Sequence, residues 1–260
     1  MRGPVVGRDH GHLPGASGWA FAKVYGHPDR QAAILTRHLP ELLADLGDGA
    51  GRVGAWADGL RRAGLVSGLQ WDTYRPETGR YGTGAAMAAA EAVFAADSAA
   101  ALAQLALTAA GAPHPHPHPH PHPQTVTAAS FVDIAASFTG GTGAGARWLI
   151  DRIPKLPVPA ANQHLTGETL RLTGPDGAAL RSLPGGDRTA AAWAARCTAL
   201  AAYRDHVAAS ALPTDAVLAS LLHMHHIRMH GPDEDSERAC QRLARAAALS
   251  WTARREGTRR

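Results

Sequence analysis

The sequence has few cysteines. Cys197 and Cys240 are the two that it contains, and their spacing is far from a CxxC pair. Two cysteines cannot supply the disulfide framework of a small secreted domain. Both fall in segments with helical patterning, where a free cysteine typically behaves as a small buried hydrophobic residue. We therefore expect both thiols to be reduced, buried and structural.

The sequence also lacks long apolar runs and blocks of like charge. No uninterrupted stretch of about 18 apolar residues occurs, and the N-terminus has no apolar segment of signal-peptide length. The net charge is +4, from 26 basic and 22 acidic residues spread along 260 positions. That balance is too weak to indicate nucleic-acid binding. These absences predict a cytoplasmic globular protein with no direct membrane or nucleic-acid partner.

Alternating and helical periodicities both occur in the chain. Aromatic and β-branched residues predict a strand over 19–25, and a second strand is expected over 65–74. Apolar residues at three- and four-residue steps predict the longer helices. These helices cover 30–46, 53–63, 85–110 with a break at Asp97-Ser98, 125–138, 189–210, 216–229 and 234–253. With two short strands expected near 170–172 and 179–183, the sequence predicts an α+β fold, a helix-rich single domain around a small, mostly antiparallel sheet.

A proline–histidine tract divides the chain. Proline at every second position of 113–123 forces extended or polyproline geometry, in which residues two apart do not share a face. The tract therefore predicts a linker and not a preorganised metal site. We expect a flexible N-terminus over 1–18, two parts of one domain over 19–112 and 124–253 on either side of the 113–123 linker, and a tail over 254–260.

A loop dense in charge and hydroxyl groups follows the second predicted strand. Arginines held in one loop can bind a carboxylate or stabilise an enolate. The structural alternative is that Glu77 pairs with an arginine and fixes a tight turn. The candidate side chains of the loop are Asp72, Tyr74, Arg75, Glu77, Arg80 and Tyr81.

A histidine-rich helix is predicted near the C-terminus. His223, His226 and His230 stand at i, i+3 and i+7 and therefore share one face. This spacing could chelate zinc, but the HExxH position holds no acidic residue and Cys240 is far along the chain. A single histidine that donates or accepts a proton is the favoured interpretation, because imidazole titrates near neutral pH.

Several strings together resemble the small, C-terminal, glutamate-elimination-type domain of lantibiotic dehydratases. The most specific is TYxPExxRYG within residues 71–82. The resemblance extends from residue 19 to residue 251. Further matching strings are AEAVFAADS at 90–98, RWLIDR at 147–152, LPGG at 183–186, AAYR at 201–204 and SLLHM at 220–224.

The resemblance implies a reaction without a cofactor or metal. In that family a partner domain or protein transfers glutamate from glutamyl-tRNA to peptide Ser or Thr, and the small domain eliminates it to leave dehydroalanine or dehydrobutyrine. The implied partners are a precursor peptide with leader and core, and a separate tRNA-dependent glutamyl-transfer protein; a homodimer is compatible with this scheme. The resemblance implies catalytic roles for Arg80, His223, Tyr81 and Arg228, and substrate binding by Arg75, Glu77 and Tyr74.

The chain departs from the family pattern in one segment. The family carries a strand with an HLRLR string between its first two helices, whereas residues 46–53 here pass directly from one predicted helix to the next. Ile227 also stands where the family commonly has asparagine. Two alternatives to elimination therefore stay open. One is the [4+2] cycloaddition of the related thiopeptide pyridine synthases, with loss of the leader peptide, and the other is a non-catalytic partner that binds a leader peptide.

Overall fold

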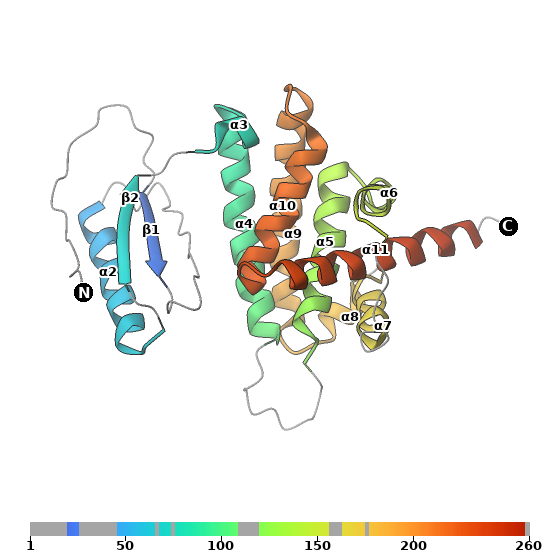
Figure 1. Cartoon of the computed structure of the whole chain (residues 1–260), viewed down its shortest axis with the longest axis horizontal. Coiled ribbons are helices and arrows are strands. Elements are labelled where there is room, and N and C mark those ends of the chain that lie inside the picture. The colour runs from blue at the N-terminus through green and yellow to red at the C-terminus, as the bar shows by residue number, and fades with distance from the viewer. Residues whose placement is uncertain are drawn as a thin grey trace. The chain divides into compact units, whose positions relative to one another are not determined.

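The computed structural model describes residues 20–25, 46–65, 68–73, 76–108, 120–155, 163–174 and 177–257. The chain divides into two compact units, Met1–Arg75 and Pro76–Arg260 (Figure 1). The helix predicted over 30–46 lies outside the described residues except for its last position, and so do residues 113–119 of the proline–histidine tract.

Among its described residues, the first unit contains a pair of antiparallel strands and one helix. Strand β1 (Ala20–Tyr25) pairs with β2 (Gly68–Thr73), with Ala20 opposite Thr73 and Tyr25 opposite Gly68. Helix α2 (Leu46–Arg62) packs against β2. It begins seven residues before the helix predicted over 53–63, so it includes the whole segment in which the HLRLR string would be expected.

The second unit is built from helices. It begins with the one-turn α3 (Thr78–Tyr81) and the long α4 (Ala85–Thr108). Helices α5 (Pro123–Thr139), α6 (Thr142–Arg152), α7 (Gln163–Leu172) and α8 (Ala178–Arg181) follow. The last three are α9 (Gly186–Ala208), α10 (Thr214–His230) and α11 (Glu234–Gly257).

Four long helices form the centre of this second unit. Helix α9 packs against both α4 and α5, and α10 packs against the same two helices. Helix α11 runs across the group and contacts α5, α6 and α7 (Figure 1). The largest buried side chains of the centre come from α5, α9 and α10. They include Phe131, Ile134, Phe138, Leu200, Tyr203 and Leu218.

The predicted α+β fold around a sheet is wrong. No strand occurs among the described residues of 76–260, and the core there is made by helix packing alone. The short strands predicted near 170–172 and 179–183 are instead the end of α7 and the single turn α8. The alternating apolar residues do not form strands. Leu172 and Leu180 instead lie in one buried cluster with Val126 of α5.

Helix α4 is apolar because it lies in the core. By length and composition it could cross a membrane, with a mean hydropathy of 1.4 in its most apolar window. It carries Glu91, Asp97 and Gln104, and all three are buried. The break predicted at Asp97-Ser98 is wrong, since the helix runs without interruption and Ser98 donates a hydrogen bond to the Phe94 carbonyl one turn earlier. Buried polar side chains of this kind are characteristic of a core helix with partners.

The described end of the proline–histidine tract begins α5. His122 is the N-cap residue of α5, and its Nδ1 accepts a hydrogen bond from the Gln124 amide at 3.2 Å. Glu168 of α7 accepts hydrogen bonds from the His122 amide and the Thr125 hydroxyl. Pro123 occupies the first helical position, where its missing amide proton costs nothing. The last residues of the tract therefore form the capped N-terminus of α5.

Candidate functional site

The one-turn helix α3 carries the arginine that the TYxPExxRYG string singled out. Arg80 Nε lies 3.1 Å from Glu77 Oε2, and both side chains are more than half exposed. The glutamate–arginine pair considered from the sequence is therefore present. Since both partners are solvated, their interaction is weak and can be replaced by another carboxylate.

Tyr81 connects this exposed arginine to the helical core. Its side chain is buried, and its ring meets Phe94 of α4 edge-to-face at 4.9 Å between centroids. Arg80 lies close enough to donate a hydrogen bond to the phenol oxygen of Tyr81. Burial and the nearby Glu77 carboxylate raise the pKa of Tyr81, so its phenol stays protonated at neutral pH. Tyr203 of α9 donates a hydrogen bond to the Tyr81 carbonyl at 3.0 Å.

Arg228 of α10 also contacts Phe94. Its guanidinium carbon is 5.7 Å from the Phe94 ring centroid, a cation–π distance. Arg228 also donates from Nε to Ser98 and from Nη1 to Asp97 Oδ2, both at 3.1 Å. Two of the predicted catalytic residues, Tyr81 and Arg228, therefore contact the same aromatic ring from α3 and α10.

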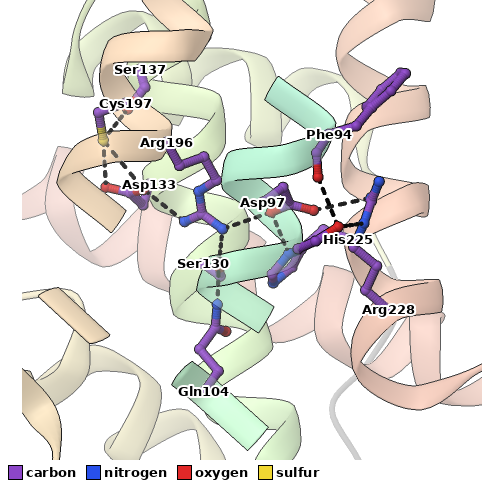
Figure 2. A network of polar contacts seen from close by, with 11 residues as sticks. Phe94, Asp97, Gln104, Ser130, Asp133, Ser137, Arg196, Cys197, His225 and Arg228 are labelled. Atoms are coloured by element: carbon purple, nitrogen blue, oxygen red, sulfur yellow. Dashed lines mark hydrogen bonds and ion pairs between the residues drawn. The ribbon is translucent and has the colours of Figure 1, made fainter. Parts of the chain in front are cut away.

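A buried ionic network extends inward from Arg228 (Figure 2). Asp97 accepts hydrogen bonds from Arg228, from His225 Nδ1 at 2.7 Å and from Arg196 Nη1 at 3.0 Å. Arg196 of α9 is fully buried and also bonds Asp133 at 2.8 Å. One carboxylate from α4 thus gathers charged groups from α9 and α10, while a second carboxylate from α5 binds the other terminal nitrogen of Arg196.

The protonation states of the network follow from its contacts. Burial alone would raise the pKa of Asp97, but the His225 ring and the two guanidinium groups hold it well below its usual range. Burial lowers the pKa of His225 in spite of Asp97, so the ring is neutral. An ionised carboxylate can only accept hydrogen bonds. His225 Nδ1 must therefore be protonated and donate the hydrogen bond to Asp97.

The polar neighbours of Arg196 also explain one of the two cysteines. Cys197 Sγ accepts a hydrogen bond from Ser137 at 3.0 Å and lies 3.5 Å from the Asp133 oxygens. Burial and the Asp133 carboxylate raise the pKa of the Cys197 thiol. A thiol in that environment is a poor nucleophile, so Cys197 belongs to the structural network, although it is partly exposed and not buried as predicted.

His223 lies apart from the arginines. Its Nδ1 is 2.9 Å from Glu237 Oε2 of α11, and its side chain is half exposed. Five residues along a helix correspond to about 140° of rotation, so His223 and Arg228 point away from each other. No contact joins His223 to Arg80, Tyr81 or Arg228 among the described residues. His225, which the sequence did not single out, is the histidine that belongs to the arginine network.

Two of the predicted site residues are not among those that the structure describes. Tyr74 and Arg75 lie outside the described residues, so their predicted binding roles stay predictions. Arg196 and Asp97 were missed, although an arginine and an aspartate inside alanine-rich helices are a signal of buried pairing. Their partnership could not be read from the sequence, because 99 residues separate them.

Comparisons with known proteins agree on one family. A family model described as "Lantibiotic biosynthesis dehydratase C-term" matches residues 47–248. Comparison with curated proteins finds no match. Among solved structures, the chain resembles the tRNA dependent lantibiotic dehydratase MibB from Microbispora sp. 107891, with a TM-score of 0.68 and 26% identity. The match covers 92% of this chain and 25% of that chain, so the present chain spans about a quarter of that protein's length.

Proposed function

This chain belongs to the lantibiotic biosynthesis dehydratase C-terminal family, and we propose that it tailors ribosomally made peptides by eliminating glutamate from glutamylated Ser or Thr. The products are dehydroalanine or dehydrobutyrine and free glutamate. Its partners in this proposal are a precursor peptide and a separate protein that transfers glutamate from tRNA, and the reaction takes place in the cytoplasm without a cofactor.

The exposed pair of Arg80 and Glu77 is the observation that carries this proposal. Arg80 already holds a glutamate carboxylate in solvent-accessible geometry. The side-chain carboxylate of a glutamylated substrate offers the same chemical group, so it can displace Glu77 at little cost. Arg80 then holds the glutamyl group while the bond between the substrate β-carbon and the ester oxygen breaks and the departing carboxylate takes the electron pair.

Tyr81 and Arg228 act as positioning residues in this proposal. The Tyr81 side chain is buried, contacts Phe94 and interacts with Arg80, so it anchors the helix that carries Arg80. Arg228 is held by Asp97 and Ser98 and also contacts the Phe94 ring. The rigid core thereby supports the one-turn helix that carries the exposed arginine.

His223 is the proposed proton-transfer residue. It has no contact with Arg80 among the described residues, so the proposal requires the glutamylated residue to extend from Arg80 to His223. The hydrogen bond to Glu237 favours the tautomer with its proton on Nδ1, which leaves the lone pair of Nε2 free to accept a proton. That nitrogen removes the α-proton of the glutamylated residue, the electron pair forms the new double bond, and glutamate departs with the electrons of the broken carbon–oxygen bond. The proton on His223 then passes to solvent.

Release of glutamate tests this proposal directly. The purified full chain is incubated with a chemically glutamylated Ser-containing precursor, and mass spectrometry follows the loss of glutamate. We expect elimination by the wild type and at least about a hundred-fold slower elimination by Arg80→Ala, the scale for losing one preorganised donor. Arg238→Ala is the matched control, because Arg238 forms a similarly exposed pair with Glu234 in α11. An unchanged mass with the wild type contradicts elimination.

The missing HLRLR segment favours pyridine synthesis as a second candidate. Helix α2 occupies residues 46–62 without the arginine-bearing strand of the family. A [4+2] cycloaddition between two dehydroalanines has no glutamate to bind and would tolerate that loss. The same protein is therefore incubated with a precursor that already contains two dehydroalanines. Loss of water and of the leader peptide would establish the synthase, and binding of leader peptide without turnover of either substrate would indicate a non-catalytic partner.

A further inference from the structure

Three potential metal ligands meet where α10 ends and α11 begins. His226 and His230 stand one helical turn apart on α10, and Cys240 faces them from α11. Their nitrogen and sulfur ligand atoms all lie within 4.8 Å of one another, and His226 and Cys240 are fully buried. This cluster is separate from the arginine network, whose histidine is His225.

The polar groups of His226 are unsatisfied within this cluster. Neither ring nitrogen of His226 has a hydrogen-bond partner among the described residues, although the side chain is completely buried. Its ring stacks on that of His230 at 4.8 Å. An imidazole buried without a partner loses the hydrogen bonds it would make to water, which costs about 1–3 kcal/mol. The buried ring of His226 is therefore suited to bind a ligand through one of its nitrogens.

The neighbouring groups prepare the cluster for a cation. The Asp233 and Glu237 carboxylates lie close enough to both His226 and Cys240 to favour a bound cation. A cation that binds the sulfur of Cys240 displaces the thiol proton to solvent.

We propose that His226, His230 and Cys240 bind one zinc ion that joins α10 to α11. Two imidazole nitrogens and one thiolate are a ligand set that zinc accepts, with a fourth position for water. Tetrahedral bonds of about 2.0–2.3 Å imply ligand separations of roughly 3.3–3.6 Å. His230 Nε2 and Cys240 Sγ are already 4.0 Å apart, so small rotations of the three side chains close the site.

Zinc at this site would also rearrange one existing contact. His230 Nε2 now lies 2.9 Å from the Thr127 hydroxyl of α5. When that nitrogen binds metal, its contact with Thr127 is lost. The site would then hold α10 and α11 together at the turn that contains Gly231, and α10 is the helix that also positions His225 and Arg228.

Cobalt provides a probe that reports the thiolate and not only metal content. The chain is purified without a histidine tag or nickel, treated with chelator, and titrated with Co²⁺. His114, His116 and His118 of the proline–histidine tract are first replaced by glutamine to reduce metal binding there, while His120 and His122 are kept because they form hydrogen bonds near the start of α5. We expect one equivalent of Co²⁺ to produce a near-ultraviolet thiolate-to-cobalt absorption band, and one equivalent of Zn²⁺ to remove it.

The two cysteines form a matched pair of variants. Cys240→Ser and His226→Ala should lose the band, whereas Cys197→Ser and His223→Ala should keep it. Circular dichroism establishes that each variant is folded before titration. In parallel, Zn²⁺ should raise the Tm of the parent protein and leave the Tm of folded Cys240→Ser unchanged. Absence of the band in the parent protein, or its survival in Cys240→Ser, would overturn the zinc site and would leave the elimination assay unaffected.

Discussion

Two arginine–carboxylate clusters in the helical unit contain the same chemical groups but differ in burial and in the number of partners. Arg196 and Asp97 are buried between α4 and α9, and every strong charge there has a partner of opposite sign. Arg80 and Glu77 lie on α3 in solvent, as a single pair three residues apart. Ion pairs of the first kind depend on one another, whereas a pair of the second kind contributes little to folding.

This difference separates the residues that hold the helices from those available to a substrate. A buried network with its partners in place cannot accept a ligand without leaving a charge unpaired, which is costly. An exposed pair can exchange its carboxylate freely. Arg228 connects the two clusters, since it bonds Asp97 on one side and contacts the ring of Phe94, the neighbour of Tyr81, on the other.

The largest expected effect comes from removing the shared carboxylate. Asp97→Ala leaves Arg196 with one counter-charge, and we expect the free energy of unfolding to fall by about 3–5 kcal/mol, the scale for breaking a buried pair. Urea unfolding followed by circular dichroism measures the loss. If the alanine variant does not fold, Asp97→Asn provides the measurement. A loss below about 1 kcal/mol in either variant would mean that the network does not organise the core.

Lowering the pH should show the contribution of Asp97 to stability without a mutation. Because the pKa of Asp97 is lowered in the folded protein, its stabilising contribution is complete above the unfolded value of about 3.9 and is lost as pH falls through the folded value. The free energy of unfolding should therefore decrease as pH drops below about 4. Urea titrations at several pH values measure this slope, which should be shallower in Asp97→Asn.

Arg228 should show an intermediate effect on stability. Arg228→Met keeps much of the apolar stem but loses two hydrogen bonds to Asp97 and Ser98, and bonds of charged groups contribute about 1.5–3 kcal/mol each at most. We expect a loss of that order, measured by urea unfolding, together with slower elimination. Normal stability with normal elimination would contradict the role of Arg228 as the connection between the clusters.

Arg80 should separate activity from stability. Arg80→Ala removes an exposed pair, so the free energy of unfolding should change by less than about 1 kcal/mol. Elimination of glutamate should nevertheless be lost in the mass-spectrometric assay. A large loss of stability would indicate that the α3 pair is structural, like the buried network.

Glu77 should have the smallest effect of the series. Glu77→Gln is an exposed substitution and should change the free energy of unfolding by no more than about 0.5 kcal/mol. Since the variant no longer competes with the substrate carboxylate for Arg80, the KM for the glutamylated precursor should fall while kcat stays similar. A raised KM would instead support the substrate-binding role predicted for Glu77 from the sequence.

The sequence predicted elements better than it predicted their partners. The helices of the last third were found with small errors at their ends, because apolar spacing and the Gly231-Pro232 turn are local signals. The strand predictions near 170–172 and 179–183 failed because short apolar runs do not distinguish a strand from a buried helix end. The α+β prediction of one domain around a sheet was wrong because the strands that did form, β1 and β2, belong to the first unit and the described core of the second unit is helical.

The candidate site shows the same division between local and distant information. The pairing of Glu77 with Arg80 was considered from the sequence because three residues separate them. The contact of Cys240 with His230 was dismissed from the sequence distance, although the turn between α10 and α11 brings the two to 4.0 Å. His225 was missed because its partner Asp97 is 128 residues away. Position on α10 alone does not distinguish His225 from His223 as the functional histidine.

The hydrogen bond from Tyr203 to the Tyr81 carbonyl gives heating a specific consequence. Helix α3 is a single turn; this bond ties it to the long helix α9, and the Tyr81 ring ties it to Phe94 of α4. A short segment tied by so few contacts opens at a lower temperature than the four-helix centre. Activity should therefore disappear on warming while the helical signal persists, and it should return on cooling because the core that receives Tyr81 has never melted.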